Sequence, residues 1–522
     1  MEFDPANDYK DCSVEIKRLE ALVNKLNNIG VMLSAEKNTD KLLDMILAES
    51  MEITSCDAAS IYVKVEKDGR SMLQFKNTRN YSREFPFNEF FMPIDENSIS
   101  GYCAYSGQAY NFMNMDDVPR LIGIKYNDFF DKKINYQTTN MMVIPMKDIK
   151  GEVEGVVQLI NKKKDGRKKL MEDHDYVEYI VPFTTEEESI LLSLASQTAV
   201  LLERTRLMDE IQILFDSFVE SMVTTIEKRD PTTSGHSIRV AKYVKEFALA
   251  VNRVDYGKYG DVHFTEDEIK ELHYSGLLHD VGKIGVSESV LQKENRLTVP
   301  EIRAIQYRFN YVKKDLALRT LQGTSTEEEN TLLENIDDYC QFVTAVNTKG
   351  FLPDEEEAKL RLIASYQIVD FDNITRPLLD ESEMTNLTVK KGNLTNADRD
   401  QMNQHAEYTY QILKDIPWIK NLSFVPKIAA AHHEKLDGTG YPNRLKEDEI
   451  TLQSKMLAII DIFEALTAID RPYKKAMPVD KALKILEEEA TFHHVDKDLF
   501  EIFVNERLYE TCLNSASEGS KS

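Results

Sequence analysis

The chain has 522 residues, of which 42% are hydrophobic, and a formal charge of −25 at pH 7. That length predicts two to four domains, with enough apolar residues for real cores. The acidic balance argues against a nucleic-acid polymer as a partner, because binding a phosphate backbone requires a basic surface. A small anionic ligand remains compatible with this charge, since bound metal ions can supply positive charge locally.

The cysteines and the apolar runs indicate the compartment. Five cysteines are spread along the chain without C-x-x-C spacing, which makes a disulfide framework improbable and fits a reducing environment. The first residues are acidic and contain no apolar signal core. No apolar run approaches the length of a membrane span. We therefore expect a cytoplasmic protein with no membrane partner.

The first 205 residues predict a helix over residues 1–33 and then a mixed domain. Residues 38–40 form a plausible cap for a second helix, and two hairpins follow, over residues 59–75 and 141–160. Helices would therefore flank an antiparallel sheet. This order, together with the segment 101–108, resembles a GAF domain over residues 34–205. The resemblance implies an α+β sensor domain.

A short signature strengthens this resemblance. Asn161-Lys162, Phe183 and Glu187-Glu188 are similar to the signature of cyclic-nucleotide-binding GAF domains, with glutamate in place of aspartate. The resemblance implies a pocket for a small ligand such as a cyclic nucleotide. Because the signature mostly braces the pocket in that family, it does not identify the ligand.

Residues 184–229 contain neither glycine nor proline, which predicts one long helix that connects two domains. Apolar residues recur along it at a spacing of three and four. Paired with a second copy, this stripe would form a parallel coiled coil and make the protein a homodimer. The alternative is a helix that packs on its own domains. The stripe consists of Leu191, Leu194, Leu201, Met208, Phe215, Val219, Met222 and Ile226.

The second half of the chain carries histidines and aspartates in an unusual order. His279-Asp280 ends an apolar run, His432-His433 precedes the turn Gly438-Thr439-Gly440-Tyr441-Pro442, and Asp461 ends a further apolar run. Imidazole and carboxylate side chains are good ligands for divalent transition metals. These motifs resemble the HD-GYP family of metal-dependent cyclic-dinucleotide phosphodiesterases, over residues 226–510. The resemblance implies an all-α domain after the long helix.

The resemblance also implies roles for individual residues. Asp280 would bridge two ions and act in catalysis, and Lys283 would stabilise charge on the phosphoryl oxygens. A water between such ions would become the nucleophile. Two or three divalent ions are expected, with iron or manganese preferred over zinc because no thiolate is in the set. The implied metal ligands are Glu227, His236, His279, Asp280, His405, His432, His433 and Asp461, with Asp230 a less favoured substitute for Glu227. The implied substrate contacts are Lys283, Gly440, Tyr441, Pro442, Arg471 and Lys474.

The sequence departs from the family in three places. Glu464 stands where aspartate is usual, and one extra residue precedes Arg471. In the family, the segment that begins near residue 296 leads to the next metal histidine. Here Arg308 occupies the position expected for that histidine, and the next histidine in the chain is His405. Residues 299–391 therefore read as an acidic, mostly helical insertion, either a lid or partner surface at the site or a peripheral decoration. Residues 511–522 read as a disordered tail.

The leading prediction is a dimeric phosphodiesterase that hydrolyses cyclic di-GMP to pGpG, GMP or both, under control of the GAF domain. This would be a role in bacterial second-messenger signalling. One alternative is a phosphodiesterase for another cyclic nucleotide or dinucleotide, such as cyclic GMP-AMP. The other is a signalling module that binds a cyclic dinucleotide while catalysis is suppressed.

Overall fold

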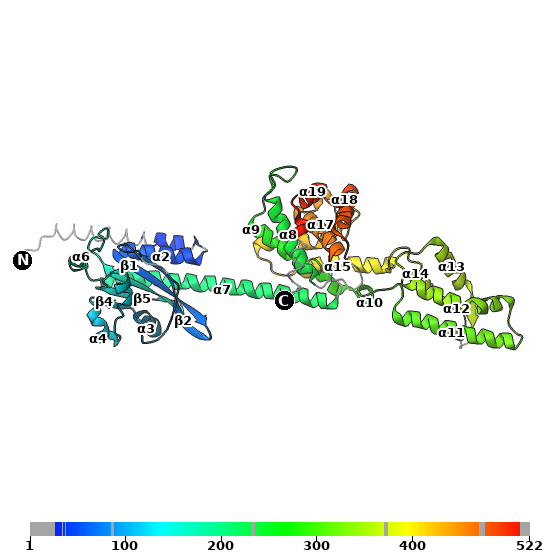
Figure 1. Ribbon diagram of the computed structural model, residues 1–522, viewed down its shortest axis with the longest axis horizontal. Helices are drawn as coiled ribbons and strands as arrows, with labels where there is room; N and C mark the ends of the chain where they lie inside the picture. The colour runs from blue at the N-terminus through cyan, green and yellow to red at the C-terminus, as the bar shows by residue number, and fades with distance from the viewer. Residues whose placement is uncertain are drawn as a thin grey trace, which may run out of the picture. The chain divides into compact units, whose positions relative to one another are not determined.

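The computed structural model describes residues 24, 27–33, 35–36, 38–84, 88–230, 235–369, 374–468 and 476–511. The chain forms two units, residues 1–215 and 216–522, and the division falls within one long helix (Figure 1). The predicted helix over residues 1–33 and the predicted tail lie largely outside the described residues. None of the described helices combines the length and the apolar content that crossing a bilayer would need.

The first unit is built on one antiparallel sheet of six strands, in the order β3-β2-β1-β6-β5-β4. Both predicted hairpins are confirmed, although the strands are longer than predicted. The α+β fold expected for this half is therefore confirmed. The strands are β1 (Cys56–Lys67), β2 (Arg70–Asn80), β3 (Phe91–Pro93), β4 (Tyr110–Phe112), β5 (Met141–Lys147) and β6 (Val153–Lys162). The helices are α2 (Thr39–Thr54), α3 (Ile99–Ser106), α4 (Val118–Ile122), α5 (Phe129–Ile134), α6 (Asp173–Glu178) and the start of α7 (Thr185–Arg229).

Alternation along the strands gives this sheet two apolar faces. Ile61 packs in one core with α2 and α7, whereas its neighbour Tyr62 packs in the other core with α3. Successive side chains of a strand point to opposite faces, so a sheet covered on both sides reads as a nearly continuous apolar run. The strand β5 is such a run and is buried over six of its seven residues.

The residues of the GAF-like signature tie the last strand to the start of α7. Lys162 Nζ lies 2.7 Å from Glu187 Oε2, and the same oxygen accepts a hydrogen bond from the backbone nitrogen of Thr184. The amide oxygen of Asn161 accepts the backbone N–H groups of Thr139 and Asn140. Lys162 and Glu187 therefore brace the sheet against the connecting helix, and Asn161 braces the neighbouring strand.

The predicted connecting helix is α7, but its predicted dimer stripe is mostly used within the chain. Leu191 and Leu194 are buried in the core of the first unit, and Val219 and Ile226 are buried as well. Of that stripe, Met208 is exposed, and the other exposed apolar side chains of α7 in the first unit lie beside it, at Val200, Leu207, Ile211, Ile213 and Leu214. The buried members of the stripe therefore pack within the chain, as the alternative expects, while the predicted dimer stays a prediction.

The second unit is helical, as predicted, and its main core joins helices that are far apart in the sequence. Val240, Leu272, Ile428 and Phe463 belong to this one core. Its elements are the end of α7, α8 (His236–Val251), α9 (Glu266–Leu278), the 3-10 turn η3 (Val281–Gly285), α10 (Glu288–Leu291), α15 (Asn396–Lys414), α16 (Val425–Ala430), α17 (Leu452–Thr467), α18 (Val479–Thr491) and α19 (Lys497–Asn505). The histidine motifs all lie at the ends or on the inner faces of these helices.

Residues 299–391 build a core of their own. It contains α11 (Val299–Leu321), α12 (Glu327–Asn347), α13 (Asp354–Ser365), the short strands β7 (Gln367–Val369) and β8 (Thr375–Pro377), and α14 (Glu381–Leu387). The predicted helical character is confirmed. Arg308 pairs with Glu383 at 2.8 Å inside this segment.

A fully buried arginine closes the two ends of this segment on each other. The Arg296 guanidinium donates to the carbonyl oxygens of Lys349, Leu387 and Val389, and Leu297 exchanges hydrogen bonds with the Asn347 side chain. Both stems are therefore fixed by buried hydrogen bonds, which makes the segment a compact subdomain rather than a long loop.

Candidate metal centre and sensor pocket

Seven of the eight predicted metal ligands come from five separate helices and meet in one place. His236 begins α8, His279 follows α9 and Asp280 precedes η3. His405 lies on α15, His432 and His433 follow α16, and Asp461 lies on α17. Of these seven side chains, His433 is half-buried and the others are buried.

A glycine allows the two halves of the site to approach. A Cβ on Gly282 would lie 1.9 Å from the carbonyl oxygen of His405 and 2.4 Å from the backbone nitrogen of Thr409. The Thr409 hydroxyl accepts the N–H of Gly282 and donates to the carbonyl oxygen of His279. The turn after His279-Asp280 is therefore packed directly on α15, which carries the next histidine.

The first group of ligand atoms is His236, His279 and Asp461. The Nε2 atoms of the two histidines are 3.2 Å apart, and Asp461 Oδ1 lies 3.1 Å from His236 Nε2 and 3.7 Å from His279 Nε2. Two nitrogens and one carboxylate oxygen thus converge on one point, a donor set that suits a divalent transition metal.

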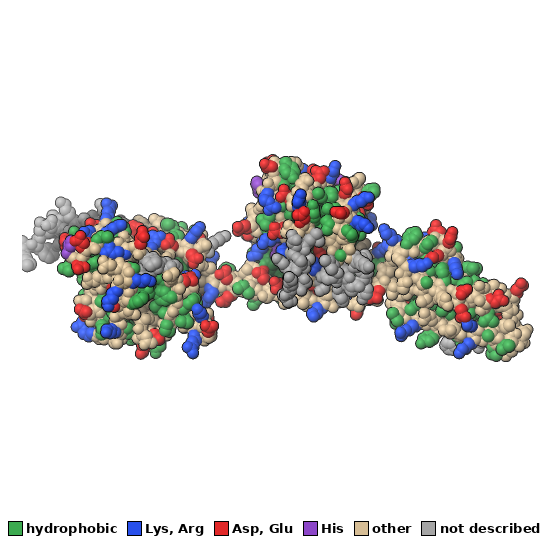
Figure 2. Space-filling model, viewed as in Figure 1, with side chains coloured by type: hydrophobic (Ala, Val, Ile, Leu, Met, Phe, Trp, Pro, Cys, Tyr) green, Lys and Arg blue, Asp and Glu red, His purple; other side chains and the backbone are tan. Residues whose placement is uncertain are grey.

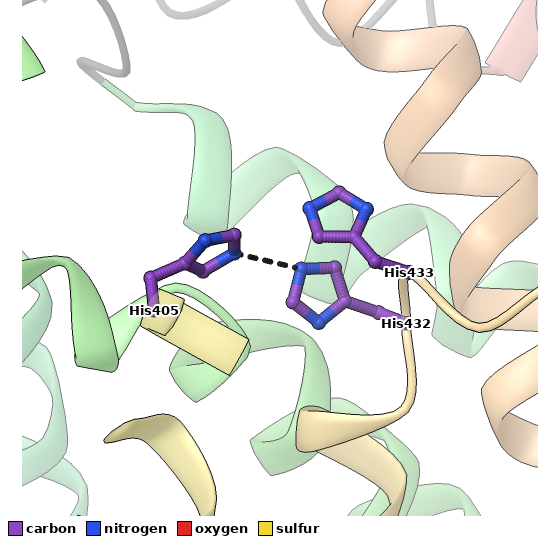
Figure 3. Close-up of side chains that lie close together, drawn as sticks. All are labelled: His405, His432 and His433. Carbon is purple, nitrogen blue, oxygen red and sulfur yellow. Dashed lines mark hydrogen bonds between the residues drawn. The ribbon is translucent and has the colours of Figure 1, made fainter. Parts of the chain in front are cut away.

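The second group is His405, His432 and His433, whose ring nitrogens converge in Figure 3. His405 Nε2 lies 3.4 Å from His432 Nε2, and the rings of His432 and His433 have centroids 3.9 Å apart. All three donors are imidazoles, so this group supplies only nitrogen ligands.

The Asp280 carboxylate lies between the two groups. Its Oδ2 atom is 3.5 Å from His279 Nε2 and 3.9 Å from His236 Nε2, whereas Oδ1 is 3.5 Å from His405 Nε2. His279, Asp280 and His432 also form a third possible set of ligands. One oxygen therefore faces each group, which is the geometry that a bridging carboxylate requires.

The tautomers of three histidines follow from their second hydrogen bonds. The Nδ1 atoms of His279, His405 and His432 lie 2.6 to 2.7 Å from the carbonyl oxygens of Gly276, Met402 and Ala429. A carbonyl oxygen can only accept, so each Nδ1 carries the proton and each Nε2 of the neutral ring presents a lone pair. The buried lone pairs of His405 and His432 face one another at 3.4 Å and repel, and a bound cation removes that repulsion. The residues therefore fit divalent metal ions at both groups.

The lowered pKa values of the histidines in the second group favour metal binding. Burial lowers the pKa of His433 to about 4 and also lowers that of His405, and burial with the neighbouring imidazoles holds the pKa of His432 well below its usual value. These rings are therefore neutral at pH 7 and able to bind a metal. Burial opposes ionisation of Asp280, but Lys283 and the imidazoles outweigh it and keep the pKa of that carboxyl well below its ordinary value.

The first group is more polar. Burial tends to lower the pKa of His236, yet its contacts with Asp461 and Glu464 prevail and raise the pKa to about 9. Glu464 Oε2 accepts from His236 Nδ1, and Oε1 accepts from Arg239 Nε at 2.6 Å. The sequence predicted no role for Glu464. Its spacing, three residues after Asp461 on one helix, was the available signal, because positions i and i+3 share a helix face.

Lys283 lies between two carboxylates. Its Nζ atom is 2.8 Å from Asp280 Oδ2 and 3.2 Å from Asp230 Oδ2. Asp230 therefore holds this lysine. The Glu227 carboxylate accepts the backbone N–H groups of Gly235 and Ser237 at the start of α8, and Glu227 belongs to none of the three ligand groups among the described residues.

A buried glutamate, Glu434, stabilises the turn that contains Gly438 and Gly440. Glu434 accepts the backbone N–H groups of Asn443 and Leu445, at 2.7 and 2.9 Å. A Cβ on Gly440 would lie 2.3 Å from the backbone nitrogen of Lys435, so only glycine fits there. The Tyr441 ring lies 4.8 Å from the His433 ring, between centroids, so the turn borders the second group. Glu434 is a further residue to which the sequence assigned no role.

Two predicted substrate contacts cannot be placed. Arg471 and Lys474 lie outside the described residues, in the gap between residues 468 and 476. Pro442 follows Tyr441 across a cis peptide bond and is half-buried beside the turn.

The first unit contains a cavity of about 250 Å³ on the α3 face of the sheet. Aromatic rings and uncharged polar side chains share its lining, and Phe90 stacks with Phe130 at 6.0 Å between centroids. Gln158 accepts from Ser100 at 3.0 Å in the same cavity. Among the described lining residues, Lys125 and Asp131 are the charged ones. The cavity is thus a largely neutral, aromatic site of a size that suits a small ligand.

Comparisons with known proteins agree with both halves. A GAF-domain family profile matches residues 38–202, and two HD-domain family profiles match residues 233–345 and 381–499. The chain combines a GAF domain with an HD domain. The GAF and HD resemblance that the motifs suggested is thereby confirmed. The first HD match extends through α11 and most of α12, and residues 346–380 lie between the two matches.

Two curated relatives from Vibrio cholerae carry activities in their names. A "3'3'-cGAMP-specific phosphodiesterase 3" is 50% identical over 281 residues, which cover 53% of this chain and 36% of that protein. A "Cyclic di-GMP phosphodiesterase" is 25% identical over 322 residues, or 62% of this chain and 45% of that protein. The chain therefore spans less than half the length of either relative. A solved GAF domain/HD domain protein from Geobacter sulfurreducens aligns with a TM-score of 0.25 and 13% identity, over 34% of this chain and 98% of that one.

Proposed function

We propose that this chain is a metal-dependent phosphodiesterase that hydrolyses a cyclic dinucleotide. The observation that carries the proposal is the Asp280 carboxylate, with one oxygen facing each of two buried ligand groups. Two ions held by these groups would supply an activated water and charge stabilisation for in-line displacement at phosphorus. The names of the two relatives support the same reaction class.

The chain's own residues have defined tasks in this proposal. His236, His279 and Asp461 would hold the first ion, His405, His432 and His433 the second, and Asp280 both. Iron or manganese suits these nitrogen and oxygen donors. A third ion at Glu227 would require that carboxylate to release the two N–H groups it accepts.

Lys283 is the proposed electrostatic catalyst. Its ammonium is 2.8 Å from the bridging carboxylate and is positioned by Asp230. Burial lowers the pKa of Lys283, but the two carboxylates outweigh burial and raise it, so the side chain stays protonated at neutral pH. A fixed cation at this place would stabilise the charge that develops on the phosphoryl oxygens.

Substrate contacts would come from the turn beside the second group. Gly440 lets the backbone of the turn fold back against Lys435, and Tyr441 and Pro442 present an aromatic and an apolar surface for a nucleotide. Arg471 and Lys474 complete the proposed contacts, as cations for phosphate or guanine edges. The metal domain is proposed to span residues 226–510, with residues 299–391 inserted, after a GAF domain over residues 34–205.

Two cyclic dinucleotides are candidate substrates. Cyclic di-GMP is the first candidate, because several relatives are named as its phosphodiesterases. 3'3'-cGAMP is the second candidate, because the relative with 50% identity is named as specific for it. The two substrates differ in one base, so the residues that contact the second base would decide between them.

The test uses the full chain, reconstituted with Mn²⁺ or Fe²⁺ under reducing conditions. Each substrate is supplied at equal concentration, and the linear dinucleotide and the mononucleotide are separated by chromatography. The proposal predicts metal-dependent turnover of at least one substrate. The ratio of the kcat/KM values for the two substrates then identifies the preferred one. If the protein holds two ions but turns over neither substrate, the proposed phosphodiesterase activity is refuted. That result would favour a module that only binds the dinucleotide.

The aromatic cavity of the first unit is the proposed regulatory site. A small ligand there, such as a cyclic nucleotide, would act on the link between Lys162 and Glu187 at the start of α7. Isothermal titration of the full chain with cyclic mononucleotides tests this, with Phe90→Ala as the variant that opens the stacked ring pair. If the native chain and Phe90→Ala bind the nucleotide with equal affinity, this cavity is not the ligand site.

Dimerisation through α7 is also proposed, on a face that differs from the predicted stripe. Leu207, Ile211 and Leu214 are exposed at spacings of four and three residues, as in a coiled-coil seam. Sedimentation equilibrium should give twice the chain mass for the native protein and a lower average mass for Leu214→Glu. An unchanged mass for this variant would exclude the seam.

A further inference from the structure

The inserted segment carries a surface that the proposed reaction does not use. Its first helix, α11, has two apolar stripes. One stripe is buried against α12 in the core of the segment and consists of Ile305, Phe309, Val312 and Leu316. The other lies on the opposite face of the same helix, where a surface helix ordinarily presents polar residues.

The second stripe is exposed along its whole length. Tyr307 is 74% exposed, Tyr311 42%, Leu318 53% and Leu321 86%. With Lys314 these residues follow one another at spacings of four, three, four and three, which is the a and d pattern of a coiled coil. We call Tyr307, Tyr311, Lys314, Leu318 and Leu321 the α11 stripe. Figure 2 shows hydrophobic and basic side chains among others along the edge that α11 forms.

The charges of the stripe restrict what can cover it. Lys314 and the flanking Arg303 are exposed, and neither forms an ion pair within the described residues. The acids of α11 are engaged elsewhere, since Glu301 caps the helix at Thr298 and Asp315 pairs with Arg319. A partner must therefore offer apolar side chains together with groups that accept two cations.

A second copy of α11, running antiparallel, meets these requirements. If Tyr307 faces Leu318 of the other copy, the equal spacing of four residues places Tyr311 opposite Lys314. The lysine then lies near an aromatic ring, a favourable cation–π arrangement. Arg303 lies near the C-terminal end of the other helix, where the free carbonyl groups carry partial negative charge. A parallel pair would instead set Lys314 against Lys314.

We propose that the α11 stripe is a self-association surface, through which two copies of this chain pair antiparallel about a twofold axis. The part of α11 from Arg303 to Leu321 is about 27 Å long at 1.5 Å per residue. Its two tyrosines and two leucines offer roughly 500 Å² per copy, below the ~800 Å² of a standard interface. The association is therefore weak and depends on concentration, and it is separate from the seam on α7.

The test is disulfide cross-linking in the full chain. Ala304→Cys and Leu321→Cys are combined in one protein, because these positions face each other in the end layer of the antiparallel pair. They lie about 25 Å apart on one helix, so no disulfide can form within a chain. The two inner layers keep their native side chains. Oxidation with diamide is followed by non-reducing electrophoresis, with the native chain as the background for its own cysteines.

The antiparallel pair predicts a covalent dimer of the double variant and only background from either single variant. Adding Leu318→Glu to the double variant should reduce the dimer roughly tenfold or more. Cross-linking of Ala304→Cys alone, as strong as in the double variant, would indicate a parallel pair and overturn the proposal. No dimer in the double variant, with both thiols reactive toward a maleimide, would also overturn it and leave the stripe to a different protein.

Discussion

Glu464 offers a sharp test of the metal centre, because it touches a ligand without being one. Its carboxylate accepts from His236 Nδ1 and from Arg239 Nε and is only 2% exposed. In Glu464→Gln the acceptor oxygen can stay, but the negative charge is lost and an NH₂ group meets Arg239. His236 then becomes a weaker base and a less firmly oriented ligand.

The substitution is expected to lower metal affinity mainly at the site of the first ion. Removing an outer partner of a metal histidine typically costs 10- to 100-fold in affinity, or about 1.4 to 2.8 kcal/mol. We therefore expect the first ion of Glu464→Gln to bind that much more weakly. The second ion should be affected less, because its three imidazoles do not touch Glu464.

The assay is a calorimetric titration of the metal-free protein with Mn²⁺, which resolves two classes of site. Glu407→Gln is the matched control, since Glu407 lies two residues from His405 but bonds to Gln411 rather than to a histidine. Thermal unfolding of the metal-free proteins checks that the fold is intact. Equal weakening of both sites, or native affinity at both, would refute the assignment of Glu464 to His236.

Other substitutions test the remaining parts of the structure. Asp280→Ala should lose activity and metal together, as judged by elemental analysis; two retained ions would exclude a bridge. Lys283→Ala should keep its ions and lower kcat by roughly 10²-fold, whereas a change in KM alone would argue against electrostatic catalysis. Gly440→Ala should lower turnover and thermal stability, because the new methyl group meets backbone 2.3 Å away; native values would mean that the turn can shift. Lys163→Met should destabilise the GAF domain by about 3 to 5 kcal/mol in denaturant unfolding, since it leaves the fully buried Asp57 without its ion pair, and a loss under 1 kcal/mol would contradict this.

Local sequence determined much of this protein. The strand-like apolar runs of residues 59–75 and 141–160, each interrupted by turn residues, were enough to predict both hairpins, and the absence of glycine and proline over residues 184–229 was enough to predict α7. The resemblance of the histidine and aspartate motifs to the HD-GYP family identified the seven side chains that meet at the metal centre. These signals survive in a single sequence because each depends on neighbours close along the chain.

Tertiary structure decided which surfaces are free and which side chains support others. The apolar residues of α7 looked like one dimer seam, yet Leu191 and Val219 are buried within the chain and Ile211 is exposed. Helical periodicity gives an apolar face but does not say which neighbour covers it. Likewise, Glu464 gained its partner His236 from an element 228 residues away, and the exposed face of α11 became visible only once its other face was packed. Long-range packing of this kind leaves no local pattern, so only the folded chain reveals it.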